Sequence, residues 1–442
     1  MSPVIQKCGR NASASLQDLL IHNRLSGKGG VYAVCSAHPW VIDAAIQQAM
    51  ENGSFLHIES TSSQVNQLGG YSGQTPSQFA DFVHAAARRM ELPHDQILLG
   101  GDHLGPFPWR TEASNSALNK ACEIARACVL AGYRKLHLDA SMACADDAKV
   151  LSEQTVARRA VVLCEAAEEA VKCLPPGTDL PLYVIGTEVP VPGGESAMGA
   201  PPALTTVESL RQTLQVFREA FDERGLSAAW QRVIAVVVQP GVEFGDNLVF
   251  AYDRAKARSL SAGLPSSPSL VYEAHSTDYQ SPGALAQMVE DHFAILKVGP
   301  WLTFAFREAV FALSAIEQEL LTGEKSQRLS QVREALDEAM LRKPIYWRSY
   351  YQGDERQLRI ARAYSYSDRC RYYWHEKSVQ TEIERLIENL TARALPLTLI
   401  SQYLPLEYAA IRAEKIENEP GAIIRYHIQF VLRSYATACG MV

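Results

Sequence analysis

The run Ile97-Leu98-Leu99-Gly100-Gly101-Asp102-His103 begins as a short apolar segment and ends in a carboxylate and a histidine. Seven more short, β-rich segments lie along the chain, and most of them are apolar throughout. Strands of this kind are typical of a parallel sheet that is covered on both faces. The eight segments are Val31–Ala37, Phe55–Glu59, Ile97–Asp102, Lys135–Asp139, Leu182–Glu188, Val233–Gln239, Ser269–His275 and Ala294–Val298.

Stretches with helical periodicity separate these segments, among them Gln78–Met90, Asn115–Ala131, Thr155–Lys172 and Ser209–Arg224. Alternating strands and helices predict an α/β fold with right-handed crossovers. Eight such units within about 320 residues predict a (β/α)₈ TIM barrel. The alternative is a doubly wound open sheet, but no Gly-x-Gly-x-x-Gly follows the first strand to support it.

The pattern changes after the eighth segment. From Glu317 onward the chain is mostly helical and charged, so we predict a barrel over residues 1–316 and a helical C-terminal extension over 317–442, packed on the barrel. Seven of the 18 tyrosines and two of the six tryptophans lie between Tyr346 and Trp374. This aromatic cluster is expected to form either an internal core or an interface with a partner chain.

The composition is that of an ordinary soluble globular enzyme, with 47% hydrophobic and 21% charged residues. Nine cysteines are scattered singly, which argues for reduced thiols rather than a disulfide framework. The net charge is −7 and there is no block of basic residues, so we do not expect nucleic acid as a partner. The first residues do not resemble a signal peptide and the longest apolar run, Val233–Val238, is far too short to span a membrane, so we expect a cytoplasmic protein.

Polar residues stand at or just beyond the C-terminal ends of the predicted strands. In a barrel these ends meet on one face, where active sites are built. Their convergence therefore favours an enzyme over a scaffold. The residues are His38, Glu59, Asp102, His103, Asp139, Glu188, Gln239 and His275.

Two of these histidines and one carboxylate suggest a metal site. His103 and His275 end the third and seventh strands, and Glu188 ends the fifth, before a Pro/Gly-rich loop. Two imidazoles and a carboxylate with open positions form a plausible catalytic site for a divalent ion, with zinc as first choice and manganese, cobalt, nickel or magnesium as alternatives.

A divalent ion in this position would bind the C2 carbonyl and C3 hydroxyl of a ketose and act as a Lewis acid when the C3–C4 bond breaks. Asp102 would then exchange the proton of the C4 hydroxyl. Asp139 and Glu59 are second choices for this acid/base role, although Asp139 could instead cap the next helix.

A phosphorylated substrate also needs anion-binding groups. Ser276, Thr277 and Gly299 follow the last two strands, where barrels commonly bind phosphate, and Lys297 could add charge. Arg369 and Arg371 are further candidates, although a salt-bridged helical turn would explain that segment equally well. Gln239, at the end of the sixth strand, is also expected to contact the substrate.

Several longer motifs together resemble one family, the Z-type tagatose-bisphosphate aldolase proteins. They include Cys35-Ser36-Ala37-His38-Pro39, Gly101-Asp102-His103-Leu104-Gly105-Pro106, His137-Leu138-Asp139-Ala140-Ser141-Met142, Ile185-Gly186-Thr187-Glu188-Val189-Pro190, Val238-Gln239-Pro240-Gly241-Val242-Glu243-Phe244 and the segment Ser365–Trp374. The resemblance covers nearly the whole chain. It implies a class II aldolase-like barrel of ketohexose phosphate metabolism, used in galactitol or N-acetylgalactosamine breakdown.

Members of this family are often described as a non-catalytic subunit that stabilises a separate Y-type aldolase, so the resemblance implies such a partner and an oligomer. Some relatives are described as 4-epimerases of tagatose and fructose or their phosphates. Others have been called kinases, but this chain has no Gly-x-x-x-x-Gly-Lys-[Ser/Thr] run. Asp102, His103 and His275 match the acid/base residue and two metal ligands of class II aldolases, whereas Gln239-Pro240-Gly241 stands where those enzymes have another histidine.

Overall fold

Eight parallel strands close into a barrel in a computed structural model that describes residues 11–187, 201–265, 267, 269–323 and 328–442. The order around the barrel is β1-β10-β9-β6-β5-β4-β3-β2. This confirms the predicted (β/α)₈ fold, with one strand from each of the eight apolar segments. The strands are β1 (Val31–Cys35), β2 (Leu56–Thr61), β3 (Ile97–Leu104), β4 (Lys135–Leu138), β5 (Leu182–Ile185), β6 (Val233–Val237), β9 (Val271–Ala274) and β10 (Ile295–Val298).

Helices pack around the strands and bury the outward faces of the barrel. Several begin at a side chain that caps the first free N–H groups, such as Thr75 before α3 and Ser281 before α9. An antiparallel hairpin, β7 (Glu243–Phe244) with β8 (Val249–Phe250), follows β6. The helices of this part are α1 (Ala12–Ser26), α2 (Pro39–Asn52), α3 (Pro76–Arg89), α4 (Ser114–Leu130), α5 (Glu153–Val171), α6 (Val207–Glu223), α7 (Ser227–Trp230), α8 (Arg254–Ser261), α9 (Pro282–Glu290) and α10 (Pro300–Leu321).

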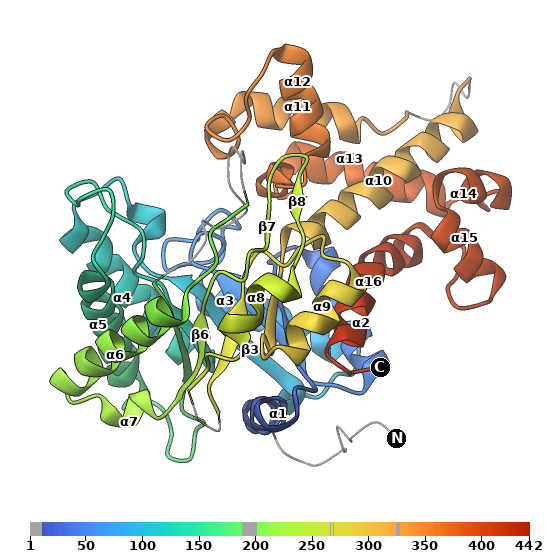
Figure 1. The fold of residues 1–442 in the computed structure, drawn as a ribbon. Coiled ribbons are helices and arrows are strands. Elements are labelled where there is room, and N and C mark those ends of the chain that lie inside the picture. The colour runs from blue at the N-terminus through green and yellow to red at the C-terminus, as the bar shows by residue number, and fades with distance from the viewer. Residues whose placement is uncertain (1–10, 188–200, 266, 268, 324–327) are drawn as a thin grey trace.

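The rest of the described chain is helical, as expected. Figure 1 shows α11, α12 and α13 at the end of the barrel opposite to α1. The elements are α11 (Val332–Arg342), α12 (Glu355–Tyr364), the 3-10 turn η4 (Arg369–Tyr372), α13 (Lys377–Thr391), α14 (Leu397–Tyr403), α15 (Pro405–Arg412) and α16 (Pro420–Ala438). The expected boundary between residues 316 and 317 falls inside α10, and the division into two domains stays a prediction.

The last helix, α16, packs back onto the barrel. It contacts α2, α9 and α10, so it fills the place in the outer ring between the helices that follow β9 and β1 (Figure 1). Tyr435 donates a hydrogen bond from its hydroxyl to the Thr277 carbonyl oxygen at 2.7 Å, which ties α16 to the end of the seventh barrel strand. None of the helices in the described ranges has both the length and the apolar character to cross a membrane.

Candidate active site

Asp102 and His103 are neighbours in β3, yet both side chains line the same cavity. Successive strand residues normally point to opposite faces. Here the register between β3 and β4 shifts between Gly101 and Leu104, and His103 has a φ of 46°, in the left-handed region. A local bulge of this kind re-aims side chains, and backbone strain is concentrated at functional sites.

Glycine is required directly after this bulge. A Cβ atom on Gly105 would lie 1.6 Å from the Asp139 carbonyl oxygen, so any larger residue would push β3 away from the end of β4. The close approach is fixed by a 2.9 Å hydrogen bond from the Asp139 N–H to the Leu104 carbonyl oxygen. Gly105 thereby keeps the polar ends of the two strands together.

Three imidazole rings converge at this end of the barrel. The His103 centroid lies 5.2 Å from that of His137 and 4.9 Å from that of His275, and the latter two are 5.0 Å apart. Together with Asp102 they form a buried cluster in which one potential ligand atom from each residue lies within 4.8 Å of the others. Neutral imidazoles are the usual nitrogen ligands of zinc and related ions.

Each of the three rings is held by its own carboxylate. This arrangement fixes the tautomer and the direction of a metal-binding histidine. The second nitrogen of the buried His137 ring, Nε2, has no hydrogen-bond partner within the described part of the chain, as expected for an atom that serves a ligand. The pairs are His103 Nδ1 with Asp139 Oδ2 at 2.8 Å, His137 Nδ1 with Asp102 Oδ1 at 3.0 Å and His275 Nε2 with Glu273 Oε1 at 3.0 Å.

The residues of this cluster therefore fit a divalent ion. Burial alone would raise the pKa of Asp102, but the neighbouring His103 and the hydrogen bond from His137 hold it well below its usual range. Burial alone would lower the pKa of His103, but the charge of Asp102 and the bond to Asp139 raise it to about 9. A metal ion and a proton thus compete for His103.

A second polar layer lies deeper in the barrel. Lys135 Nζ contacts Glu59 Oε1 and Glu273 Oε2, both at 2.6 Å, and all three side chains are fully buried. Lys297 forms ion pairs with Glu59 and, at 2.9 Å, with Asp102 Oδ1. Burial lowers the pKa of Lys297 to about 8, so the amine remains mostly charged at neutral pH.

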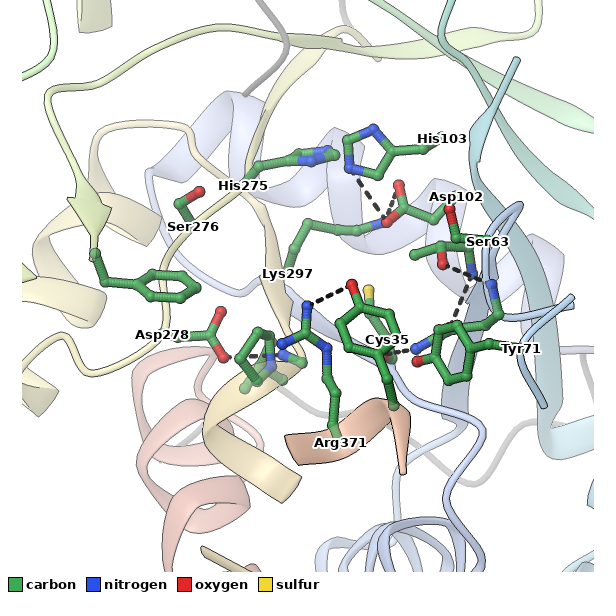
Figure 2. Close-up of a pocket in the computed structure, with 17 residues that line it drawn as sticks. Cys35, Ser63, Tyr71, Asp102, His103, His275, Ser276, Asp278, Lys297 and Arg371 are labelled. Carbon is green, nitrogen blue, oxygen red and sulfur yellow. Dashed lines mark hydrogen bonds and ion pairs between the residues drawn. The ribbon is translucent and has the colours of Figure 1, made fainter. Parts of the chain in front are cut away.

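Several predicted residues lie together on the cavity wall. Asp102, His103 and His275 are joined there by Ser276, Gly299 and Arg371, and by Lys297, whose ammonium group contacts Asp102 (Figure 2). Arg371 comes from η4, so the C-terminal extension contributes directly to the cavity. The cavity is also lined by Asp278, which the sequence analysis did not name as a site residue.

Other predicted residues have different surroundings. Glu59 belongs to the deeper layer, and Asp139 does not cap a helix but supports His103 and accepts a hydrogen bond from the Ser141 N–H. Thr277 is buried against Tyr435 and the Lys297 carbonyl oxygen.

Two more predicted residues, Arg369 and Gln239, do not line this cavity. The Arg369 guanidinium lies over the Tyr350 ring beside a separate cavity. Gln239 is bonded to Thr205 and the Gly241 N–H. Glu188 lies outside the described residues.

His137 is a candidate ligand that was not predicted from the sequence. The period of two in a strand would have indicated it, because Lys135 and His137 share one face of β4 while Leu136 and Leu138 share the other. The inward face of β4 thus carries one residue of each polar layer.

The closed barrel and the polar cluster at its strand ends define the chain as a (β/α)₈ barrel protein with a potential metal site. The family model described as D-tagatose-1,6-bisphosphate aldolase subunit GatZ/KbaZ-like matches residues 16–440, and the chain belongs to this family.

One solved structure is closely similar. It is a protein of Sinorhizobium meliloti 1021 described as a probable tagatose 6 phosphate kinase, with 43% identity and a TM-score of 0.85 over 93% of this chain and 100% of that chain.

Two further structures are distant. The fructose-bisphosphate aldolase of Campylobacter jejuni has 14% identity and a TM-score of 0.42, over 88% of this chain and 96% of that one. The fructuronate-tagaturonate epimerase UxaE of Cohnella laeviribosi has 12% identity and a TM-score of 0.43, over 94% and 82%. Likenesses at this level say nothing about the activity of this chain.

Proposed function

We propose that this protein binds a divalent metal ion, with zinc as first choice, and carries out reversible cleavage of the C3–C4 bond of a ketohexose phosphate. The observation that carries the proposal is the set of three imidazoles, each fixed by its own carboxylate, beside a cavity that also contains Arg371. When bound, the ion would supply Lewis-acid stabilisation of the negative charge that develops on the ketone fragment.

Asp102 would act as the general base. Its pKa is held low, so it is a carboxylate at neutral pH, and it borders the cavity. It accepts the proton of the C4 hydroxyl, C4 becomes an aldehyde carbon, and the electron pair of the C3–C4 bond passes to C3. Lys297, at 2.9 Å from Asp102, would orient this carboxylate.

The proposed base and metal ligands could carry out either of two reactions. An aldolase releases the two three-carbon fragments, whereas a 4-epimerase retains them, lets the aldehyde turn its other face to C3 and rejoins the bond. Both reactions need the same base and the same metal ligands, and they differ only in the fate of the fragments.

A second candidate function is support of a Y-type catalytic aldolase, and the description of the family as an aldolase subunit favours it. In that case the protein would act as part of a hetero-oligomer. A subunit with only this role has no need of a buried cluster of three histidines and a carboxylate, which is why catalysis is the first choice.

One set of measurements separates these functions. The purified protein is analysed for bound metal and then supplied separately with tagatose 1,6-bisphosphate, tagatose 6-phosphate and fructose 6-phosphate. Formation of trioses supports an aldolase, and interconversion at C4 without trioses supports a 4-epimerase. Absence of both metal and turnover would overturn the enzymatic proposal and leave the supporting role.

A further inference from the structure

Asp368 is buried at the point where the C-terminal extension meets the barrel. It stands directly before η4 with a φ of 44°, in the left-handed region that few residues other than glycine, asparagine and aspartate adopt. Its surface is only 2% exposed, and it does not line the cavity of the candidate active site. A backbone conformation of this kind persists where the surroundings of the residue hold it in place.

The carboxylate of Asp368 is directed at α10, the helix that follows the last barrel strand. Its Oδ2 atom accepts a hydrogen bond from the Thr303 hydroxyl at 2.6 Å. Its Oδ1 atom lies 3.6 Å from Nε of Arg307, one helical turn further along. Thr303 and Arg307 are both buried, so these contacts are shielded from water and connect the extension to the outer ring of the barrel.

The charge of Asp368 serves Arg307. The Arg307 guanidinium lies over the rings of Phe304, at 4.0 Å, and Phe311, at 5.7 Å, and its Nη2 atom has no hydrogen-bond partner in the described part of the chain. A guanidinium does not lose its proton when it is buried, so it needs an anion nearby. Asp368 supplies that anion, and its second oxygen remains for the hydrogen bond from Thr303.

The backbone of the same residue binds Arg371. The Arg371 guanidinium donates hydrogen bonds to the carbonyl oxygens of Ser367 at 2.5 Å and Asp368 at 3.0 Å. Figure 2 shows Arg371 extending from η4 into the cavity. The place of the guanidinium in the cavity therefore depends on the place of this short stretch of backbone.

The start of α10 forms part of the cavity wall. Gly299 and Pro300 line the cavity, and Thr303 lies one helical turn beyond Pro300. A hydrogen bond from Thr303 to Asp368 therefore sets the position of Arg371 relative to this wall.

Two other contacts hold the segment that precedes Asp368. The Tyr366 N–H is bonded to the Asp246 carbonyl oxygen at 2.9 Å, and the Tyr279 hydroxyl is bonded to the Tyr366 carbonyl oxygen at 2.7 Å. Both contacts are made to the backbone of Tyr366, whereas Arg371 is bound by the carbonyl groups of the two residues that follow it. The side chain of Asp368 thus fixes a part of the turn that these contacts do not reach.

We propose that Asp368 is a positioning residue, which fixes Arg371 in the cavity through its hydrogen bond with Thr303. This inference rests on the proposed function, in which Arg371 binds the phosphate of the substrate. A guanidinium that is already fixed loses little freedom when it binds phosphate. A guanidinium that is free must first be ordered, which costs about three- to ten-fold in affinity.

Calorimetric titration of two full-length variants tests this role. Asp368→Gly removes the carboxylate and keeps the left-handed backbone, which glycine adopts without strain. It should bind tagatose 6-phosphate about three- to ten-fold more weakly than the wild type, with no change for unphosphorylated tagatose. Asp368→Asn keeps an acceptor for Thr303 and tolerates the same backbone, so its affinity should stay within about two-fold of the wild type. Its stability should fall, because Arg307 loses its charge partner.

Three further variants control the result. Glu414→Gly is the matched control, because Glu414 is exposed in the same extension and has a left-handed φ of 55°, and it should bind as the wild type does. When Arg371→Met has already removed the guanidinium, Asp368→Gly should weaken binding no further. Thr303→Val removes the same hydrogen bond from α10 and should reproduce the loss if Asp368→Gly does not fold.

A crystal structure of Asp368→Gly, or of Thr303→Val in its place, separates this inference from the proposed function. In it the Arg371 guanidinium should be displaced relative to α10. An unmoved guanidinium, an equal loss of affinity in Asp368→Asn or for unphosphorylated tagatose, or additive losses in the double variant would overturn the inference. A displaced guanidinium with unchanged affinity, or a wild type that binds no sugar phosphate, would count against the proposed function alone.

Discussion

The barrel interior contains two polar layers that are buried alike and built differently. In the deeper layer the ammonium groups form ion pairs with buried carboxylates. Lys135 pairs with Glu59 and Glu273, and Lys297 pairs with Glu59 and Asp102. In the outer layer one ring nitrogen of each imidazole is hydrogen-bonded to a carboxylate, and the rings converge beside a cavity. The ion pairs of Lys135 serve the fold, and the two layers meet where Lys297 contacts Asp102 and Glu273 contacts His275. Buried groups directed at the cavity serve a ligand.

The largest expected effect tests the deeper layer. Lys135→Met removes a fully buried charge and leaves Glu59 and Glu273 facing each other, so the free energy of unfolding should fall by about 3–5 kcal/mol. Urea denaturation followed by circular dichroism measures this. Lys120→Met, which removes a lysine paired at the surface with Glu112, should change stability only slightly. A similar small loss for both variants would mean that the deeper layer is not structural.

The second prediction tests the outer layer. Replacing His103, His137 or His275 by alanine should each abolish retention of metal after dialysis, from about one ion per chain to below roughly a tenth, because a three-histidine site loses most of its affinity with one ligand. Elemental analysis of the purified variants measures it. The control is His57→Ala, since His57 is buried beside Glu59 in the deeper layer. Normal metal content in the three variants would refute the site.

The third prediction compares two arginines of one turn. Arg371→Met should weaken binding of a sugar phosphate about ten- to a hundred-fold, because the guanidinium borders the cavity. Arg369→Met should leave this affinity within about three-fold, because that guanidinium lies over the Tyr350 ring beside another cavity. Titration of both variants with tagatose 6-phosphate decides between them. A loss of equal size would refute the distinction between the two arginines, and a larger loss for Arg369→Met would place the phosphate nearer to Arg369.

The barrel could be predicted from the sequence because each strand is a short, apolar, β-rich segment. Each of the eight apolar segments forms a strand, and Asp102, His103 and His275 come together because parallel strands end on one face. Alternation along a strand is also a local property. It places Glu273 and His275, two residues apart, on the same face, and their side chains are hydrogen-bonded.

What could not be predicted depends on tertiary packing. Alternation alone would point Asp102 and His103 to opposite faces, and the bulge that unites them arises between two strands. Asp278 meets the start of α10 across a loop, and the sequence offered Arg369 and Arg371 alike although only Arg371 of the two lines this cavity. The amphipathic sequence of α16 predicts a buried face, but it does not indicate that this face packs on α2 and α9.

The smallest effect concerns an ion pair outside both layers. His427 of α16 is bonded through Nδ1 to Glu407 at 2.8 Å and lies 3.4 Å from Glu308 through Nε2. Burial alone would lower the pKa of His427, but these two carboxylates raise it to about 9. Because the folded-state pKa lies above the unfolded value of about 6.5, the stabilisation is complete below pH 6.5 and is lost as the pH rises through 9.

The free energy of unfolding of the wild type should therefore fall by about 1–2 kcal/mol between pH 6.5 and 9.5 relative to His427→Gln, which cannot become charged. Urea denaturation of both proteins at the two pH values gives the difference directly, and groups common to both cancel. The loss should be smaller than that of Lys135→Met at a single pH, because Glu308 is partly exposed while the partners of Lys135 are fully buried. Parallel pH dependence in the two proteins would show that this pair does not hold α16 in place, and that the packing of its apolar face on α2 and α9 is sufficient.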